Sequence, residues 1–243
     1  MIISHRHKFI FIKPLKVAGT SLEIALSKYC GSDDILTPFG QHDEEKRREL
    51  GFTPGQNHLV PFGQQNVKDW VRLVLRARRR RQFYSHEPAA NIRKVLRRKI
   101  WNSYLKISVV RNPFDYAVSR YFWEEARRSR NANLGPLPSF ADLLTDQPEL
   151  LLENRRITHI EGDCAADVMI RYEHFADDLA DLSTRLDLSG NLADDLASIS
   201  AKTSSRPKNT SPQAMFADHP DCKRLIEILC ADDIRTYGYH APA

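Results

Sequence analysis

The chain lacks the features that would place it in a membrane or outside the cell. No uninterrupted apolar run reaches the roughly eighteen residues that a membrane-spanning helix needs. The amino-terminal segment MIISHRHKFIFIK has neither a long apolar stretch nor a small-residue cleavage site, and its apolar residues 9–12 fit a strand. We therefore expect a soluble, cytoplasmic protein without a signal peptide or a membrane anchor.

Cysteine occurs, but without an informative pattern. The four cysteines are Cys30, Cys164, Cys222 and Cys230, and they form no C-x-x-C pair and no metal-type spacing with histidine. Cys222 and Cys230 stand eight positions apart in a helical pattern, which is too far along a helix for a disulfide. We expect free thiols in a reducing compartment.

Positive charge is concentrated in one part of the chain. The net charge is +5, but residues 68–99 contain twelve Lys and Arg against Asp69 and Glu87. The densest cluster consists of Arg76 and the run from Arg78 to Arg81. A solvated helix or loop is one interpretation, and attraction of an anionic ligand is another. Nucleic acid is not the expected partner, because the segment contains no basic motif interleaved with aromatic residues.

Three segments have the pattern of a strand followed by a helix. A chain of 243 residues with 42% apolar residues can bury one substantial core. The alternation predicts an α/β fold with a P-loop-like parallel sheet flanked by helices on both faces, in one domain over residues 1–243. The expected strands cover residues 9–12, 107–110 and 168–171, and the expected helices cover residues 21–28, 113–128 and 174–186.

A long stretch rich in Gly, Pro, Gln and His, residues 33–84, interrupts this alternation. Because such a stretch inside an α/β domain is more often functional than idle, we interpret it as a loop-rich insertion on the substrate side. A helix is predicted to begin at Pro88, with Ile92, Val95, Leu96 and Ile100 at helical spacing. The last helix is predicted to begin near Asp218, with Pro220 in its first turn.

The segment KFIFIKPLKVAGTSL predicts a strand, a tight turn and the start of a helix. Its turn places Lys16 before Val17, Ala18 and Gly19, and the hydroxyl pair Thr20 and Ser21 follows. Small residues, a lysine and two hydroxyls are typical of a phosphate-binding turn. The Walker form is excluded, because it would place two glycines before the lysine. An ordinary connection with Thr20 or Ser21 as helix N-cap is the alternative.

The segment LKISVVRNPFDYAVSRY predicts a second strand that ends at Arg111. Asn112 is suited to cap the following helix and Pro113 to occupy its first turn. Arg111 thus follows the carboxyl end of a strand, where open α/β sheets bind ligands. On the helix, Asp115 and Ser119 share one face. A guanidinium with a serine hydroxyl suits a terminal phosphate, and a surface ion pair between Arg111 and Asp115 is the alternative.

Together, K-x-x-G-T-S-L and, about ninety residues later, V-V-R-N-P-F-D-x-x-x-S-x-Y resemble the sulfotransferases that use 3′-phosphoadenosine 5′-phosphosulfate (PAPS). The match is to the carbohydrate (Golgi-type, family 2) branch and its bacterial relatives. The resemblance implies the sulfotransferase fold and a glycan, possibly anionic, as acceptor. It also implies that Arg111 and Ser119 bind the 3′-phosphate. The 5′-phosphosulfate would be held by Lys16, Val17, Ala18, Gly19, Thr20 and Ser21.

The same resemblance extends to other segments, residues 85–89, 171–173, 206–211 and 233–239. It implies that the loop with Arg206 and Lys208 closes over the nucleotide or the acceptor, although a plain surface loop is nearly as well supported. One departure is Pro14-Leu15 before Lys16, where the family more often has proline directly before the lysine.

Sulfuryl transfer needs in-line positioning, a proton acceptor and stabilisation of the departing phosphate. Lys16 can donate to the oxygen on which charge develops, and no metal is required. His86 is the first candidate for general base, because a neutral imidazole can accept a proton near pH 7. Glu87 competes for this role and His58 is the third candidate. Simple capping of the helix at Pro88 is the alternative for residues 85–87.

Two other functions fit parts of the sequence. One is a small-molecule kinase with a non-Walker phosphate loop, which would need magnesium ligands that no pattern indicates. The other is a non-catalytic polyanion-binding module built around Arg76 to Arg81. No pattern specifies the oligomeric state.

Overall fold

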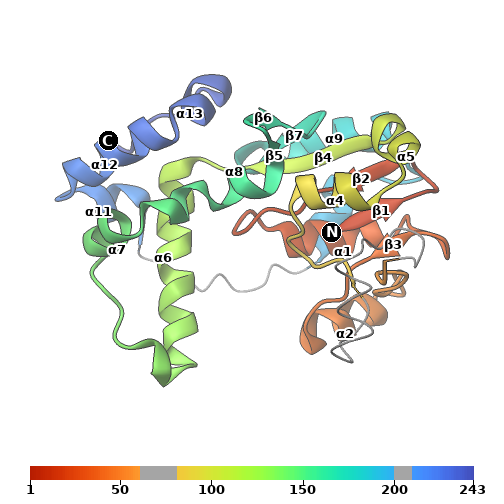
Figure 1. Ribbon diagram of the computed structural model, residues 1–243, viewed down its shortest axis with the longest axis horizontal. Helices are drawn as coiled ribbons and strands as arrows, with labels where there is room; N and C mark the ends of the chain where they lie inside the picture. Colours follow the sequence, from red (N-terminus) through yellow and green to blue (C-terminus); the bar gives the residue numbers. More distant parts are fainter. Residues whose placement is uncertain (61–80, 200–209) are drawn as a thin grey trace. The chain divides into compact units, whose positions relative to one another are not determined.

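A mixed sheet of five strands, formed by segments between Ile2 and Arg171, organises one part of the chain (Figure 1). The computed structural model describes residues 1–60, 81–199 and 210–243. The strand order is β3, β1, β2, β4, β7, and the bounds in that order are Ile35–Leu36, Ile2–Ser4, Phe9–Phe11, Leu105–Val110 and Val168–Arg171. The molecule therefore has the α/β character that the alternation of strands and helices predicts.

The direction of the strands corrects the wholly parallel sheet that we expected. β2 runs parallel to β4, with Phe11 opposite Ile107. β1, however, runs antiparallel to both β2 and β3. The reason is the short connection formed by residues 5–8, since a parallel pair needs a crossover of about a dozen residues. The prediction took residues 9–12 for the first strand and thereby missed β1.

The predicted loop-rich insertion contains regular structure in its described part. β3 forms one edge of the sheet with two residues: Ile35 pairs with Ile3 of β1, and Leu36 exchanges two backbone hydrogen bonds of 3.0 Å with Gln56. Helix α2, Gln41–Glu49, follows β3. The sequence QHDEEKRRE hid this helix, because it has no apolar residues from which a helical period could be recognised.

All three predicted strand–helix units are confirmed. β2 leads into α1 (Gly19–Ser27), β4 into α6 (Pro113–Ser129), and β7, through a 3₁₀ turn, into α9 (Phe175–Arg185). The start of α6 follows the expected chemistry, because the Asn112 side chain accepts a 3.0 Å hydrogen bond from the Phe114 amide and Pro113 occupies the first turn.

Alternate residues of β2 face two different apolar layers, as the two-residue period of a strand requires. Phe9 and Phe11 pack in one layer with residues of α1, α9 and α10 (Leu192–Ser198). Ile10 and Ile12 pack in the other with residues of α4 (Ala89–Val95) and α5 (Arg98–Ser103). Helices therefore flank the sheet on both faces, as predicted.

The helix expected from Pro88 to beyond Ile100 is two helices. α4 ends at Val95, and Leu96 and Arg97 have extended backbone with ψ of 146° and 133° before α5 begins. The apolar spacing continues through the break, so periodicity alone could not reveal it. Like charges one turn apart, at Arg93 and Arg97 and again at residues 94 and 98, disfavour an uninterrupted helix.

The chain divides into two compact units, Met1–Val109 with Arg155–Ser200 and Val110–Asn154 with Ala201–Ala243. The second unit is helical, and its core contains edge-to-face contacts of Phe216 with Phe114 and Phe140. The predicted last helix begins at Pro220, and a further helix follows it. Besides α6, this unit contains α7 (Phe140–Asp146), α11 (Pro212–Phe216), α12 (Pro220–Leu229) and α13 (Ala231–Tyr237). The single domain stays a prediction.

The remaining elements are short. They are the 3₁₀ turns Ala132–Leu134 and Pro148–Leu152, α8 (Glu153–Thr158), and a separate hairpin of β5 (His159–Ile160) and β6 (Asp163–Cys164). Within residues 1–60, 81–199 and 210–243, the helices are too short or too polar to cross a bilayer. All four cysteines are free thiols, and only Cys164 is exposed.

Candidate functional site

The turn between β2 and α1 has an unusual backbone. Lys16 and Ala18 have φ of 58° and 53°, in the left-handed region that residues with a Cβ atom seldom occupy. Each such residue costs on the order of 1 kcal/mol or more, so the surrounding structure must hold the turn in place. The fully buried Val17 side chain between them is part of that support. Backbone strain of this kind clusters at ligand-binding sites.

Gly19, the first residue of α1, permits a close approach of two chain segments. A Cβ atom at this position would lie 3.0 Å from Cγ of Lys13. That distance is shorter than an ordinary carbon contact, so another residue would need the Lys13 side chain to shift by a few tenths of an ångström. Packing against Lys13 thus favours the glycine of the predicted phosphate turn.

The hydroxyl groups that follow do not cap the helix, contrary to the alternative considered from the sequence. The N-cap residue of α1 is Ala18, and the cap has no side-chain hydrogen bond. In the described part of the chain, neither Thr20 nor Ser21 has a hydrogen-bond partner for its hydroxyl. Both hydroxyls are half-buried and belong to the first turn of α1, where backbone amides have no partner within the helix. An anion would need this combination of donors.

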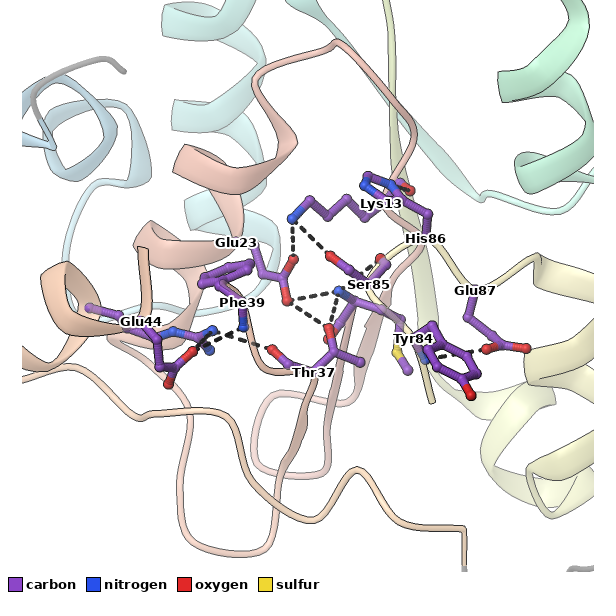
Figure 2. A network of polar contacts seen from close by, with 11 residues as sticks. Lys13, Glu23, Thr37, Phe39, Glu44, Tyr84, Ser85, His86 and Glu87 are labelled. Atoms are coloured by element: carbon purple, nitrogen blue, oxygen red, sulfur yellow. Dashed lines mark hydrogen bonds and ion pairs between the residues drawn. The ribbon is translucent and has the colours of Figure 1, made fainter. Parts of the chain in front are cut away.

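Behind the turn lies a buried polar network that the sequence did not reveal (Figure 2). Lys13, at 2% exposure, places Nζ 2.9 Å from Oε2 of Glu23 and donates a 3.0 Å hydrogen bond to Oγ of Ser85. The fully buried Glu23 also lies 2.7 Å from the ammonium group of Met1 and accepts a hydrogen bond from Thr37. A single carboxylate thus holds cations from two elements.

The charges in this network keep Glu23 ionised despite its burial. Burial alone would raise the pKa of the carboxyl, but the attraction of Lys13 and of the Met1 ammonium lowers it to about 2. The positive side of the network is extended by Arg47, which stacks on the Phe39 ring at 4.0 Å and donates to Glu44 at 2.8 Å. Lys13 lies over the same ring at 4.5 Å.

His86 contacts this network through its imidazole. Nδ1 lies 3.0 Å from the backbone oxygen of Lys13 (Figure 2). Burial lowers the pKa of His86, and the positive charge of Lys13 lowers it further. The neutral imidazole expected of a general base is therefore favoured, by burial and by the charge of a buried lysine.

Glu87 has a structural role in the same turn. Its backbone amide donates to the oxygen of Tyr84 at 3.1 Å, and its carboxylate accepts from the Tyr84 amide at 3.2 Å. The N-cap of α4 is Pro88 and has no side-chain hydrogen bond, so residues 85–87 do not cap the helix. The carboxylate of Glu87 is buried and already engaged, which makes His86 the better-placed base of the two.

His58 lies beside the segment that leads to His86. Its backbone oxygen accepts a 2.8 Å hydrogen bond from Phe83, and Leu59 forms an antiparallel bridge with Gln82. Its Nδ1 is buried without a hydrogen-bond partner in the part of the chain that the structure describes. The described end of the insertion therefore belongs to the same unit as the predicted phosphate turn and His86.

The second motif belongs, from Val110 onward, to the other unit. Nε and Nη2 of Arg111 lie 2.7 Å and 2.6 Å from Oδ2 of Asp115, so the ion pair considered as the alternative is present. One turn further along α6, the half-buried Ser119 has no partner for its hydroxyl among the described residues. On the adjoining face, Arg120 is buried and donates to Glu153 at 2.8 Å.

Several predicted site residues lie outside the described residues. These are Arg206 and Lys208, the central part of the insertion, and all of the arginine run except Arg81. Within residues 1–60, 81–199 and 210–243, no three His, Cys, Asp or Glu side chains gather in a group that could hold a metal ion.

Sequence reasoning missed Lys13 and Glu23, and one signal could have found them. Glu23 interrupts the apolar sequence of a helix that must pack against the sheet, and a buried carboxylate requires a cation. The nearest lysine at a strand end is Lys13, directly after the apolar run of residues 9–12.

Comparison of the chain with protein-family models, with curated proteins and with solved structures gave no match.

Proposed function

We propose that this protein is a PAPS-dependent sulfotransferase that transfers the sulfuryl group to a hydroxyl or amine acceptor, with a glycan as the favoured acceptor class. One observation carries the proposal. The turn after β2 contains a lysine, two residues with left-handed backbone, and two hydroxyls that bond no described residue at the start of α1. This combination suits a phosphate group better than an ordinary connection.

In this proposal the turn binds the 5′-phosphosulfate. The first amides of α1 and the hydroxyls of Thr20 and Ser21 donate to its oxygens. Lys16 donates to the oxygen that joins sulfur to the 5′-phosphate, where negative charge increases as the bond breaks. His86 accepts the proton of the acceptor hydroxyl, since its lowered pKa favours the neutral form.

The 3′-phosphate is assigned to Arg111 and Ser119 on sequence grounds. Arg111→Ala is expected to weaken binding of 3′-phosphoadenosine 5′-phosphate far more than binding of adenosine 5′-phosphate, because only the first ligand has the 3′-phosphate. A charged hydrogen bond of this type contributes roughly 1.5–3 kcal/mol. Titration calorimetry with both nucleotides measures the difference.

The matched control is Arg130→Ala, since Arg130 is an exposed arginine at the other end of the same helix. Arg130→Ala should leave the affinities for both nucleotides unchanged. Ser119→Ala should weaken binding of 3′-phosphoadenosine 5′-phosphate selectively, but by less than Arg111→Ala does. Equal losses for the two nucleotides in Arg111→Ala would limit Arg111 to its ion pair with Asp115.

The proposed reaction is tested by sulfate transfer. We expect the purified protein to move labelled sulfate from PAPS to at least one member of a panel of glycans, lipids and phenols. It should bind 3′-phosphoadenosine 5′-phosphate without added metal. Preference for ATP with magnesium would favour a small-molecule kinase. Binding of heparin without nucleotide binding, abolished by removal of the arginines at 76–81, would favour a polyanion-binding module.

A further inference from the structure

Lys13 contacts three parts of the candidate site in unit one: the start of α1, the Ser85 segment and His86. Its Cγ packs against the position of Gly19 at the start of α1, and its Nζ bonds Glu23 of α1 and Ser85. Its backbone oxygen lies 3.0 Å from Nδ1 of His86 (Figure 2). A fully surrounded lysine between the phosphate turn and the candidate base suggests more than a role in packing.

The contact between Lys13 and His86 determines which ring nitrogen bears the proton. A carbonyl oxygen can only accept a hydrogen bond, so Nδ1 of His86 must be the donor. In the neutral imidazole the other nitrogen, Nε2, then has the lone pair. The backbone of residue 13 therefore selects the tautomer in which Nε2 accepts a proton.

Some of the charged groups around His86 lower its pKa, and others raise it. After burial, the ammonium of Lys13 lowers the pKa of His86 most, and the hydrogen bond to the Lys13 backbone oxygen raises it by less. The Met1 amino group lowers this pKa and the Glu23 carboxylate raises it, each with a smaller effect. Glu87 is adjacent in sequence, with its carboxylate turned to the Tyr84 amide. Lys13 is thus the charged side chain with the largest effect on the imidazole, after burial itself.

We propose that Lys13 is a positioning residue: its backbone oxygen holds His86 in the Nδ1–H tautomer, and its buried ammonium keeps that imidazole unprotonated. The proposal rests on the proposed sulfotransferase function for its role in the reaction. As the acceptor oxygen bonds to sulfur, the bond between sulfur and the 5′-phosphate oxygen breaks, and its electron pair leaves with the phosphate. The acceptor proton moves to Nε2, and the resulting imidazolium still donates through Nδ1 to Lys13.

The test begins with nitrogen-15 NMR of the unmodified protein, with His86→Ala to assign the signals. We expect chemical shifts of a neutral Nδ1–H imidazole at pH 7 and a titration midpoint below the ordinary value for histidine. A neutral Nε2–H tautomer, or an imidazolium at pH 7, would overturn the proposal. This measurement needs no substitution at position 13, so it decides the tautomer even if such variants fail to fold.

The second arm is Lys13→Met, which keeps the backbone oxygen and removes the charge. We expect the Nδ1–H tautomer to persist and the midpoint of the His86 titration to rise. The acidic limb of the pH–rate profile for sulfate transfer should move to higher pH by the same amount. The matched control, Lys28→Met, removes a lysine from the end of α1, where it pairs with Asp195, and should change neither quantity. An unchanged midpoint in Lys13→Met would contradict the proposed role of the ammonium.

The NMR titration tests the role of Lys13, and the sulfate-transfer assay tests the proposed sulfotransferase function, so the two can fail separately. If the tautomer and the midpoint behave as expected but no acceptor is sulfated, the sulfotransferase function fails and the role of Lys13 toward His86 stands. If transfer occurs and is lost in Glu87→Gln but not in His86→Ala, Glu87 is the base and the catalytic part of the proposal is wrong.

Discussion

Lys16→Ala is expected to lower the rate constant for sulfuryl transfer by about a hundredfold or more, with only a modest loss of affinity for 3′-phosphoadenosine 5′-phosphate. The reason is that the ammonium interacts most strongly with the leaving phosphate when charge accumulates on it. Removing one such preorganised donor typically costs between about 10²- and 10³-fold in turnover. Single-turnover transfer from PAPS, together with equilibrium binding of the product nucleotide, separates the two effects.

The backbone at Lys16 requires its own control, because a left-handed φ of 58° is strained for alanine as well. Glycine adopts this conformation without strain, so Lys16→Gly should lose as much activity as Lys16→Ala if the ammonium is what matters. Recovery of the rate in the glycine variant would instead assign the loss to the shape of the turn. A loss of binding as large as the loss of rate would remove Lys16 from its role in the transition state.

Glu23→Ala is expected to lower the free energy of unfolding by roughly 3–5 kcal/mol, the usual cost of leaving one partner of a buried ion pair alone. The variant removes the carboxylate that lies 2.9 Å from Nζ of Lys13, so the buried ammonium loses this counter-charge. Adding Lys13→Met to Glu23→Ala should restore much of the loss, because the double variant no longer buries that unpaired charge. Urea unfolding at pH 7 gives the free energy of unfolding of the unmodified protein, of Glu23→Ala and of the double variant.

Because the Glu23 carboxylate is ionised in the folded protein, we expect the stability of the protein to depend on pH. The pKa of this carboxyl is about 2 in the folded protein against an ordinary value of 4.5, so its contribution is fully present above the ordinary value and is lost as the pH falls toward 2. Glu23→Ala should lack this part of the acid sensitivity. Glu49→Ala, at an exposed position at the end of α2, is the control and should change stability by no more than about 0.5 kcal/mol. A Glu23→Ala variant as stable as this control would show that the buried network contributes nothing.

The sequence predicted those parts of the fold that local pattern encodes. The strands that lead into α1, α6 and α9 are mostly apolar, and turn or cap residues follow them before the helices begin. β1 and β3 could not be predicted in the same way, because their apolar runs, residues 1–3 and 35–36, are shorter than the run 9–12 that indicates β2. The direction of β1 follows only from the length of the turn after it.

For the candidate site, the sequence indicated the phosphate turn and His86 but not the residues that hold them. The hydrogen bond from Lys13 to Ser85 joins positions 72 apart, and the contact of His86 with Lys13 joins positions 73 apart. No local pattern encodes such a contact. The carboxylate at Glu23 was the one visible sign, since an acidic residue in an apolar helix requires a partner from elsewhere in the chain.

The pairing of Leu36 with Gln56 also affects how copies of this protein can associate. Unpaired backbone groups on an edge strand are templates for the strand of another molecule. At β3, Leu36 uses its amide and its carbonyl on Gln56, and the strand is only two residues long. This side of the sheet is therefore a poor starting point for a sheet continued between molecules or for aggregation by strand addition.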